Sequence, residues 1–274
     1  MKLLNIDQGI ARLTESGDVE LLNTPYTEIG QSISEGALET LRSAGVKSTH
    51  ALIDVNVLSP VSAPPRFFIV GLNYQSHADE TGLNTETDPI YGIAEGTSVH
   101  HPNQAVLLPH EYPDKVDYEG EIGVVIGQKC ENVAASDAWD YVAGLTPVND
   151  ISARDIQRKL MADGGNFAVA KAFPTFKPMG PVLVTPDELT QPLELSIRTH
   201  VNGEMRQDGN ARDMIHDVAK IVSFISAQEV LRPGDVICTG TPDGVGVATG
   251  TFLRSGDLVE VQISDWPVLR SQIA

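Results

Sequence analysis

Two glutamates lie two positions apart in the segment KVDYEGEIGVVIG (residues 115–127), whose other residues are mostly strand formers. In a β-strand successive side chains point to opposite faces, so Glu119 and Glu121 share one face. Like charges placed side by side repel each other unless one carboxylate takes a proton or a cation joins the two. The pattern therefore allows two interpretations, a solvated strand face or part of a cation site.

A third carboxylate extends the cation interpretation. Asp150 follows an apolar run at 142–148, in the segment VNDISARDIQ. With Glu119 and Glu121 it would complete an all-oxygen set of the kind that hard cations such as Mg²⁺ accept, and open positions on the ion could bind two substrate oxygens. Asp150 could also cap a helix that starts at SARD, and capping does not exclude ligation.

Two further segments carry residues suited to acid–base chemistry. VGLNYQSHADETG (70–82) places His77 and Glu80 three positions apart, so on one helical turn the two side chains would be neighbours. AKAFPTFKPMGP (170–181) places Lys171 in an apolar setting. The glycine-rich segment TGTPDGVGVATG (239–250) matches neither the phosphate-binding P-loop nor the dinucleotide fingerprint, although its backbone amides could line a pocket.

The composition restricts the class of protein. With 274 residues, 41% of them hydrophobic and 20% charged, the chain can bury a sizeable core. A net charge of -18 and a pI near 4.6 argue against binding to nucleic acid, whose phosphates need a basic surface, and against anionic membranes. The N-terminus reads as neither signal peptide nor membrane span, and Cys130 and Cys238 lie outside any CxxC spacing. We therefore expect a cytoplasmic protein without a disulfide framework or a zinc site.

We predict a small N-terminal α+β domain over residues 1–60 and a main domain over residues 61–274. The N-terminal domain is expected to contain two strands, at 3–7 and 18–23, and a short helix at 34–45 with Ser34 as cap and Gly45 as stop. The proline-rich segment Leu58–Pro65 would connect the two domains.

The main domain reads as mainly β in an α+β arrangement, because its strands do not alternate regularly with helices. Predicted strands cover 66–72, 116–127, 180–185, 193–203, 235–240 and 257–263. An apolar stripe predicts a helix over 213–228, and residues 136–144 suit a shorter helix that begins at Ser136 and stops at Gly144.

Taken together, these segments resemble the fumarylacetoacetate hydrolase family over roughly residues 67–274. The resemblance rests on motifs in the family's order: GLNYQSHADETG, DYEGEIGVVIG, YVAGLTPVNDISARDIQ, KAFPTFKPMGP, VNGEMRQ and LRPGDVICTGTPDGVG. It implies a mixed β-sandwich or β-roll catalytic domain behind a small N-terminal α+β domain, and a homodimer.

The resemblance also implies roles for the polar residues. Glu119, Glu121 and Asp150 would hold a divalent cation, with Mg²⁺ as the first candidate and Mn²⁺ or Ca²⁺ as alternatives. His77, oriented by Glu80, would take a proton from water.

Four more positions are implied as substrate contacts, and two as catalytic residues. Gln157 would help to hold the water, and Lys171 would stabilise negative charge that develops on the substrate. The expected substrate contacts are Tyr74, Leu72, Thr241 and Gly240.

The activity implied is hydrolysis of a carbon–carbon bond in a β-diketone or acylpyruvate, a small ketonic molecule. The alternatives are a lyase or isomerase on the same scaffold (2-oxo acid decarboxylase, hydratase or dienoate isomerase) and a binding protein without turnover. Many family members carry an arginine at the position of Leu72 and a lysine at the position aligned with Glu95. Because these cations are missing here, we expect a substrate whose reacting end is neutral.

Overall fold

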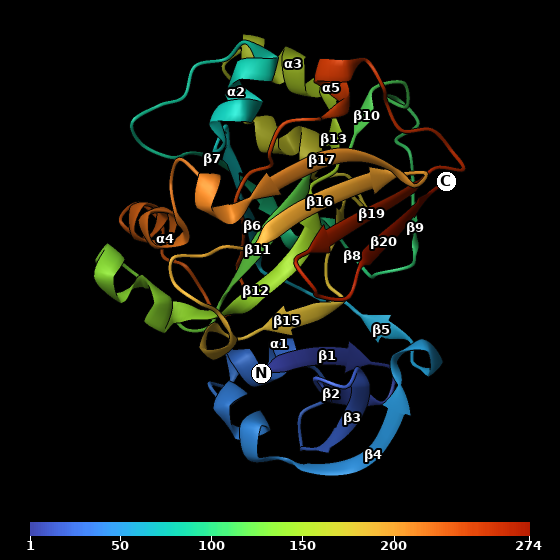
Figure 1. Cartoon of the computed structure of the whole chain (residues 1–274). Helices are drawn as coiled ribbons and strands as arrows, with labels where there is room; N and C mark the ends of the chain where they lie inside the picture. Colours follow the sequence, from blue (N-terminus) through green and yellow to red (C-terminus); the bar gives the residue numbers. More distant parts are fainter.

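The computed structural model describes residues 1–274, and Figure 1 shows a small N-terminal lobe joined to a larger body. The N-terminal strands are β1 (Lys2–Ile6), β2 (Gly9–Leu13), β3 (Asp18–Asn23), β4 (Gly45–Ala51) and β5 (Val57–Leu58). The prediction of two strands before residue 24 therefore misses β2. A hairpin loop of only two residues, Asp7 and Gln8, separates β2 from β1, and it lacks the Asn-Gly or Asp-Gly pair that usually marks such a turn.

The helix predicted at 34–45 is wrong in its boundaries. Helix α1 occupies Ile29–Ser34, so Ser34 ends a helix instead of capping one. Gly36 follows with a φ of 67°, in the left-handed region that glycine adopts without strain. The chain then forms a 3₁₀-helix at Leu38–Ser43 before β4 begins.

The largest sheet has eleven strands in the order β4-β3-β2-β1-β15-β12-β11-β18-β6-β7, with β5 beside β1. Its strands from the main body are β6 (Arg66–Gly71), β7 (Ile90–Glu95), β11 (Gly120–Ile126), β12 (Val142–Asn149), β15 (Val182–Val184) and β18 (Val236–Cys238). Strand β1 pairs antiparallel with β15, so the N-terminal strands and the main body share one continuous sheet.

A second sheet has five strands in the order β17-β16-β19-β20-β9. They are β16 (Ser196–Val201), β17 (Glu204–Asn210), β19 (Leu258–Ile263), β20 (Leu269–Ile273) and β9 (Ala105–Val106). Ile122 and Val124 of β11 belong to the same buried cluster as Ile197 of β16 and Val261 of β19, so the two sheets pack face to face. Val125 belongs to a different cluster, which means that β11 is buried on both faces.

Two short strand pairs and the helices complete the main body. The pairs are β10 (Val116–Asp117) with β13 (Ser152–Ala153), and β8 (Val99–His100) with β14 (Lys177–Pro178). The α-helices are α2 (Gln75–Thr81), α3 (Arg154–Ala162), α4 (Val218–Ser226) and α5 (Gly246–Thr249). The remaining 3₁₀-helices are Leu52–Asp54, Gly96–Ser98, Ala135–Tyr141, Phe167–Lys171, Pro186–Glu188 and Ala211–Asp213. In Figure 1 α2, α3 and α5 gather at the end of the body farthest from the N-terminal strands.

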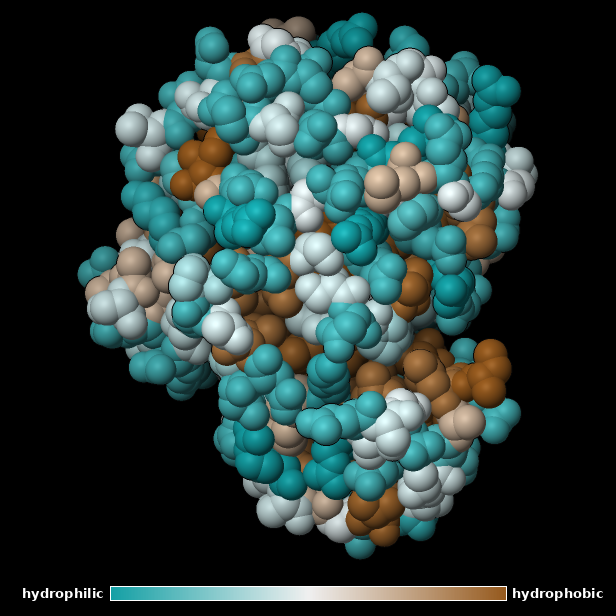
Figure 2. All heavy atoms as spheres, viewed as in Figure 1, coloured by the Kyte–Doolittle hydropathy of each residue, from teal (hydrophilic) through white to brown (hydrophobic).

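The predicted class, α+β and mainly β, is confirmed. In the main body, the helices predicted at 213–228 and 136–144 are corrected. Helix α4 starts later than expected because the Asp217 side chain accepts the backbone N–H of Lys220 at 2.8 Å and so caps it. Residues 135–141 form a 3₁₀-helix, and the apolar residues after it belong to β12. None of the helices has both the length and the apolar character needed to cross a membrane. Figure 2 shows a largely hydrophilic face, with apolar residues gathered at the waist above the N-terminal lobe.

Candidate active site

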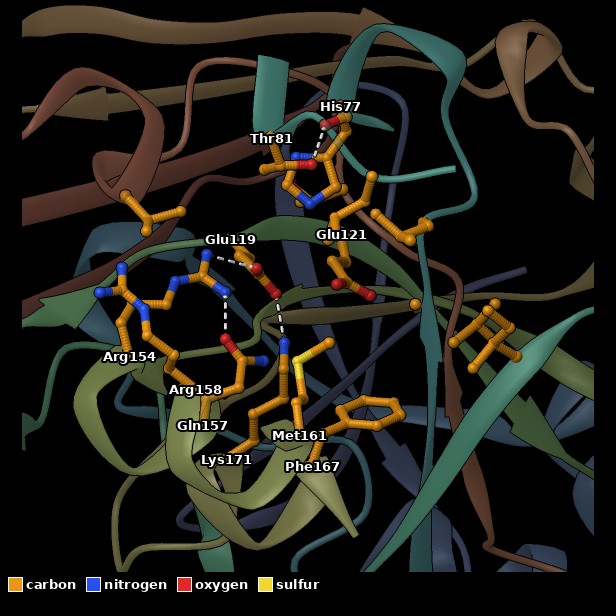
Figure 3. A pocket seen from close by; sticks show the side chains of 17 residues that line it. His77, Thr81, Glu119, Glu121, Arg154, Gln157, Arg158, Met161, Phe167 and Lys171 are labelled. Atoms are coloured by element: carbon orange, nitrogen blue, oxygen red, sulfur yellow. Dashed lines mark hydrogen bonds and ion pairs between the residues drawn. The ribbon is translucent and has the colours of Figure 1, made fainter. Parts of the chain in front are cut away.

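A cavity of about 360 Å³ opens among α2, α3 and the C-terminal end of β6. Its polar lining residues are His77, Thr81, Glu119, Glu121, Arg154, Gln157, Arg158, Lys171 and Thr241. Its other lining residues, apart from Gly71, are apolar: Val70, Leu72, Leu83, Ile90, Met161, Phe167 and Val247. Figure 3 shows how these side chains converge. A cavity that combines apolar walls with convergent polar groups is the usual form of a small-molecule site.

The three predicted carboxylates come together beside this cavity. One oxygen from each of Glu119, Glu121 and Asp150 lies within 4.8 Å of the other two, and all three side chains are buried. The strand pairing brings this about, because Glu121 faces Val148 across β11 and β12, and the Asp150 N–H donates to the Glu119 carbonyl at 2.8 Å. The shared face of the two glutamates is therefore confirmed, and the solvated strand face is excluded.

Two carboxylates of the cluster have cationic partners. Glu119 accepts from Arg154 Nη2 at 2.6 Å and from Lys171 Nζ, and Asp150 Oδ2 lies 2.6 Å from Lys171 Nζ. Burial would raise the pKa of Glu119, but the positive charges of Arg154 and Lys171 hold it well below its usual value. Burial likewise opposes the charge on Lys171, but Asp150 and Glu119 raise its pKa. Asp150 does not cap α3, since the N-cap residue is Ala153 and has no side-chain cap.

Glu121 has no cationic partner. Its carboxylate accepts the backbone N–H of Gly240 at 2.8 Å, and no ion pair reaches it. Burial and the neighbouring charge of Asp150 raise the pKa of Glu121 well above its usual value. A buried set of oxygen ligands with one uncompensated carboxylate fits a divalent cation.

His77 and Glu80 form the predicted pair on α2. The His77 Nδ1 atom lies 2.8 Å from Glu80 Oε1, and Glu80 Oε2 accepts the N–H of Gly244 at 2.9 Å. His77 lines the cavity and Glu80 lies behind it, so the second ring nitrogen is left for a ligand. Figure 3 shows the imidazole directed into the cavity, towards Glu119 and Glu121. The pair therefore faces the acidic cluster across the cavity.

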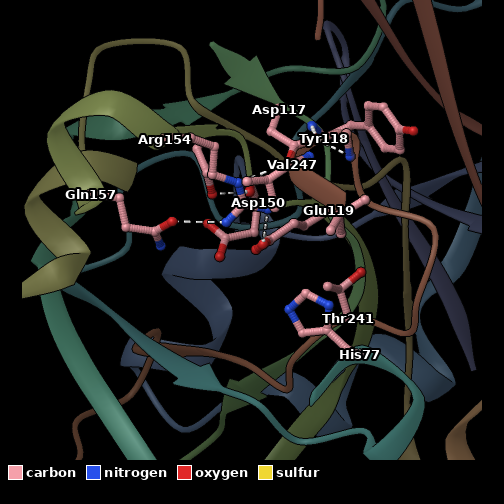
Figure 4. A network of polar contacts seen from close by, with 12 residues as sticks. His77, Asp117, Tyr118, Glu119, Asp150, Arg154, Gln157, Thr241 and Val247 are labelled. Carbon is pink, nitrogen blue, oxygen red and sulfur yellow. Dashed lines mark hydrogen bonds and ion pairs between the residues drawn. The ribbon is translucent and has the colours of Figure 1, made fainter. Parts of the chain in front are cut away.

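Arg154, which organises the cluster from α3, was not predicted from the sequence. Its guanidinium donates to Asp117 at 2.8 Å, to Glu119 at 2.6 Å and to the side-chain oxygen of Gln157 at 2.9 Å. Figure 4 shows it among these three groups. Asp117 also accepts the N–H of Gly246 at 2.6 Å, which ties α5 to the site.

The helical spacing of α3 is the signal that could have identified these residues. Arg154, Gln157, Arg158 and Met161 follow an i, i+3, i+4, i+7 pattern and all four line the cavity. Arg158 is exposed and makes no ion pair with a carboxylate of the chain. It is therefore a cation available to a ligand.

The predicted substrate contacts divide into two groups. Leu72, at a φ of 50°, and Thr241 line the cavity. Tyr74 is 1% exposed and lies outside the cavity lining, and Gly240 contacts Glu121 instead. Glu95 is exposed at the end of β7 and does not line the cavity, so the residue at this position does not bear on the charge of the substrate. The sequence around Glu95 contains no motif that fixes its alignment with the lysine of the family.

Comparisons with known proteins agree on one family. The model described as the fumarylacetoacetate (FAA) hydrolase C-terminal domain matches residues 66–274. A mitochondrial oxaloacetate tautomerase of Xenopus laevis is 36% identical over 88% of this chain and 74% of the relative. A human mitochondrial oxaloacetate tautomerase is 38% identical over 80% of this chain and 70% of the relative.

Solved structures extend the likeness to the whole chain. A putative HpcE protein from Mycobacterium smegmatis aligns with a TM-score of 0.89 and 32% identity, covering 100% of this chain and 99% of that one. A fumarylacetoacetate hydrolase from Exiguobacterium antarcticum aligns with a TM-score of 0.83 and 28% identity, covering 100% and 99% respectively.

Proposed function

The chain belongs to the fumarylacetoacetate hydrolase family, and on this premise we propose that it is a metal-dependent hydrolase that cleaves a carbon–carbon bond in an acylpyruvate-type substrate. The observation that carries the proposal is the position of His77, which lines the same cavity as Glu119 and Glu121 and has Glu80 behind it. A base and a cation site that share one cavity suit hydrolysis next to a carbonyl.

The residues of the chain have distinct tasks in this reaction. A divalent cation held by the three carboxylates would supply Lewis-acid polarisation of a carbonyl. Glu80 accepts a hydrogen bond from the Nδ1–H of His77, which keeps the proton on Nδ1 and leaves Nε2 as the base. His77 Nε2 takes a proton from water, and the water oxygen attacks the acyl carbonyl carbon. Arg154 holds the Gln157 side chain at 2.9 Å, which orients that amide beside the water.

Cleavage leaves a carbanion that needs a proton, and His77 holds the proton that it took from water. Attack by water breaks the bond between the acyl carbon and the next carbon, giving a carboxylic acid and the enolate of pyruvate. The proton on His77 can return to the enolate carbon, so the net reaction consumes one water. Lys171, which is buried beside the cavity, supplies positive charge where the enolate oxygen develops.

The cavity favours an acid over a neutral diketone. Arg158 is an exposed lining residue without an acidic partner in the chain. An arginine recognises a carboxylate through two parallel hydrogen bonds. Apolar lining from residues such as Met161 and Phe167 can hold an acyl chain. This supports an acylpyruvate and replaces the expectation of a neutral reacting end.

A second candidate is tautomerisation of a 2-oxo acid. Two of the relatives reported above are named oxaloacetate tautomerases, at 36% and 38% identity. Proton transfer at the carbon next to a carbonyl needs the same base, so His77 serves either reaction. The two reactions differ in whether water enters the product.

The test is incubation of the purified protein with Mg²⁺ and an acylpyruvate in ¹⁸O-labelled water. Hydrolysis should release pyruvate and a carboxylic acid that carries one ¹⁸O atom, detected by mass spectrometry. Loss of the enol absorbance without release of pyruvate would instead establish tautomerisation. His77→Ala should strongly slow the appearance of either signal, and an unchanged rate in that variant would contradict the assigned base.

A further inference from the structure

Lys177 is a buried lysine that the proposed reaction does not use. It lies in the segment KAFPTFKPMGP, and its side chain is 0% exposed. Burial of an ammonium group is unfavourable unless the charge is paired and its hydrogen bonds are made. The groups that it contacts therefore indicate what it does.

The partners of Lys177 belong to the cation site. Its Nζ atom lies 2.7 Å from Asp150 Oδ1 and also donates to the backbone carbonyl of Lys171. The other oxygen, Asp150 Oδ2, lies 2.6 Å from Lys171 Nζ, which also contacts Glu119. Each oxygen of Asp150 thus has its own lysine: Oδ2 contacts Lys171, which also contacts Glu119, and Oδ1 contacts Lys177.

The backbone holds Lys177 in this position. Lys177 lies on β14 opposite Val99 of β8, and Met179 forms a bridge with Val148 of β12. Asp150 follows directly after β12. Strand pairing therefore holds the backbone at both ends of the contact between Lys177 and Asp150.

We propose that Lys177 is a positioning residue that limits Asp150 to a single oxygen ligand and thereby makes the cation site select Mg²⁺ over Ca²⁺. Ca²⁺ takes about six to eight oxygen ligands and often binds a carboxylate through both oxygens, whereas Mg²⁺ prefers a few carboxylate oxygens and several waters. Lys177 blocks the two-oxygen mode at Asp150. Its charge also opposes a dication. The inference rests on the cation site of the proposed function, not on the reaction.

The test is titration calorimetry with MgCl₂ and with CaCl₂ in the absence of substrate. The wild-type protein should bind Mg²⁺ more tightly than Ca²⁺. Lys177→Met should strengthen Ca²⁺ binding relative to Mg²⁺ binding by about 10-fold, the size typical of a change in a group that holds a metal ligand. Lys177→Arg keeps the charge and should keep the wild-type preference, and Lys159→Met, at an exposed position of α3, should change neither affinity.

Each outcome decides the inference. An unchanged ratio of the two affinities in Lys177→Met would overturn it. If circular dichroism shows that this variant is unfolded, Lys177→Gln is titrated in its place and the same shift is expected. Ca²⁺ binding as tight as Mg²⁺ binding in the wild type overturns the inference as well. A protein that selects Mg²⁺ through Lys177 but leaves acylpyruvates intact would refute the proposed reaction and leave this inference standing.

Discussion

At the scale of residues, the two glutamates of the site lie in one cluster but in opposite electrostatic surroundings. Glu119 lies between Arg154 and Lys171, which lower its pKa despite its burial. Glu121 is held by one backbone amide, and burial together with the charge of Asp150 raises its pKa. Glu121 is therefore the carboxylate whose charge is least compensated by the protein itself.

Glu121→Gln should stabilise the protein without metal and remove its response to metal. The amide can still accept the Gly240 N–H, and it removes a buried charge that lacks a cationic partner, so we expect a gain of about 1–3 kcal/mol in EDTA. With Mg²⁺ the order should reverse, because only the wild type gains stability from the ligand. Thermal unfolding with EDTA and with Mg²⁺ measures both effects. The exposed Glu131→Gln variant is the control, and a Glu121→Gln protein that responds to Mg²⁺ like the wild type would refute the assignment.

His77→Ala should lower kcat on the order of 10²–10⁴-fold, the usual contribution of a general base. Affinity for Mg²⁺ should be retained, because His77 is not among the clustered carboxylates. Adding Glu80→Ala should cost little more, since residues that act as one unit are not additive. Steady-state kinetics of the single and double variants give the answer; losses that simply multiply would show that the two residues act separately.

At the scale of elements, the sequence located the parts of the site that depend on local geometry. The alternation of side chains where the chain enters β11 placed Glu119 and Glu121 on one face, and one helical turn placed His77 beside Glu80. Helical spacing groups Arg154 with Gln157 on one face of α3, but the contacts of Arg154 with Asp117 and Glu119 depend on how α3 packs and could not be predicted from local geometry. The roles assigned to single residues from the family resemblance stay predictions.

Two neighbouring cations on α3 allow a matched comparison, because Arg158 lines the cavity and Lys159 does not. Arg158→Met should raise KM for an acylpyruvate by about 10-fold or more, because a charge-assisted hydrogen bond contributes about 1.5–3 kcal/mol, while kcat changes little. Lys159→Met, on the neighbouring exposed position, removes the same charge outside the cavity. Equal KM values for the two variants would mean that Arg158 does not contact the substrate.

At the scale of the whole molecule, the N-terminal lobe is joined to the main body by sheet pairing and by charge. Strand β1 pairs with β15, and Arg42 Nη1 donates to Asp187 Oδ2 at 2.9 Å. Hydrogen bonding to Arg42 holds the pKa of Asp187 below its usual value. The division at residue 60 and the homodimer stay predictions, because a continuous sheet does not show whether the lobe folds alone.

Asp187→Asn should reduce stability at neutral pH by about 0.2–1 kcal/mol, the range for a partly exposed ion pair. A carboxylate whose pKa is lowered by folding stabilises the protein above its unfolded value of about 3.9, and the contribution is lost as the pH falls towards the lowered folded value. The difference between variant and wild type should therefore shrink below about pH 4. Urea unfolding at pH 7 and pH 3 measures it, with the exposed Asp54→Asn as control; a difference independent of pH would show that charge is not its cause.

The central claim is that Glu119, Glu121 and Asp150 bind one divalent cation. The most direct measurement is anomalous X-ray diffraction from crystals of the protein soaked in Mn²⁺. We predict a single strong peak with an oxygen of each of the three carboxylates at bonding distance, about 2.0–2.6 Å across the hard divalent cations. A peak elsewhere, or none at a saturating Mn²⁺ concentration, would contradict the claim.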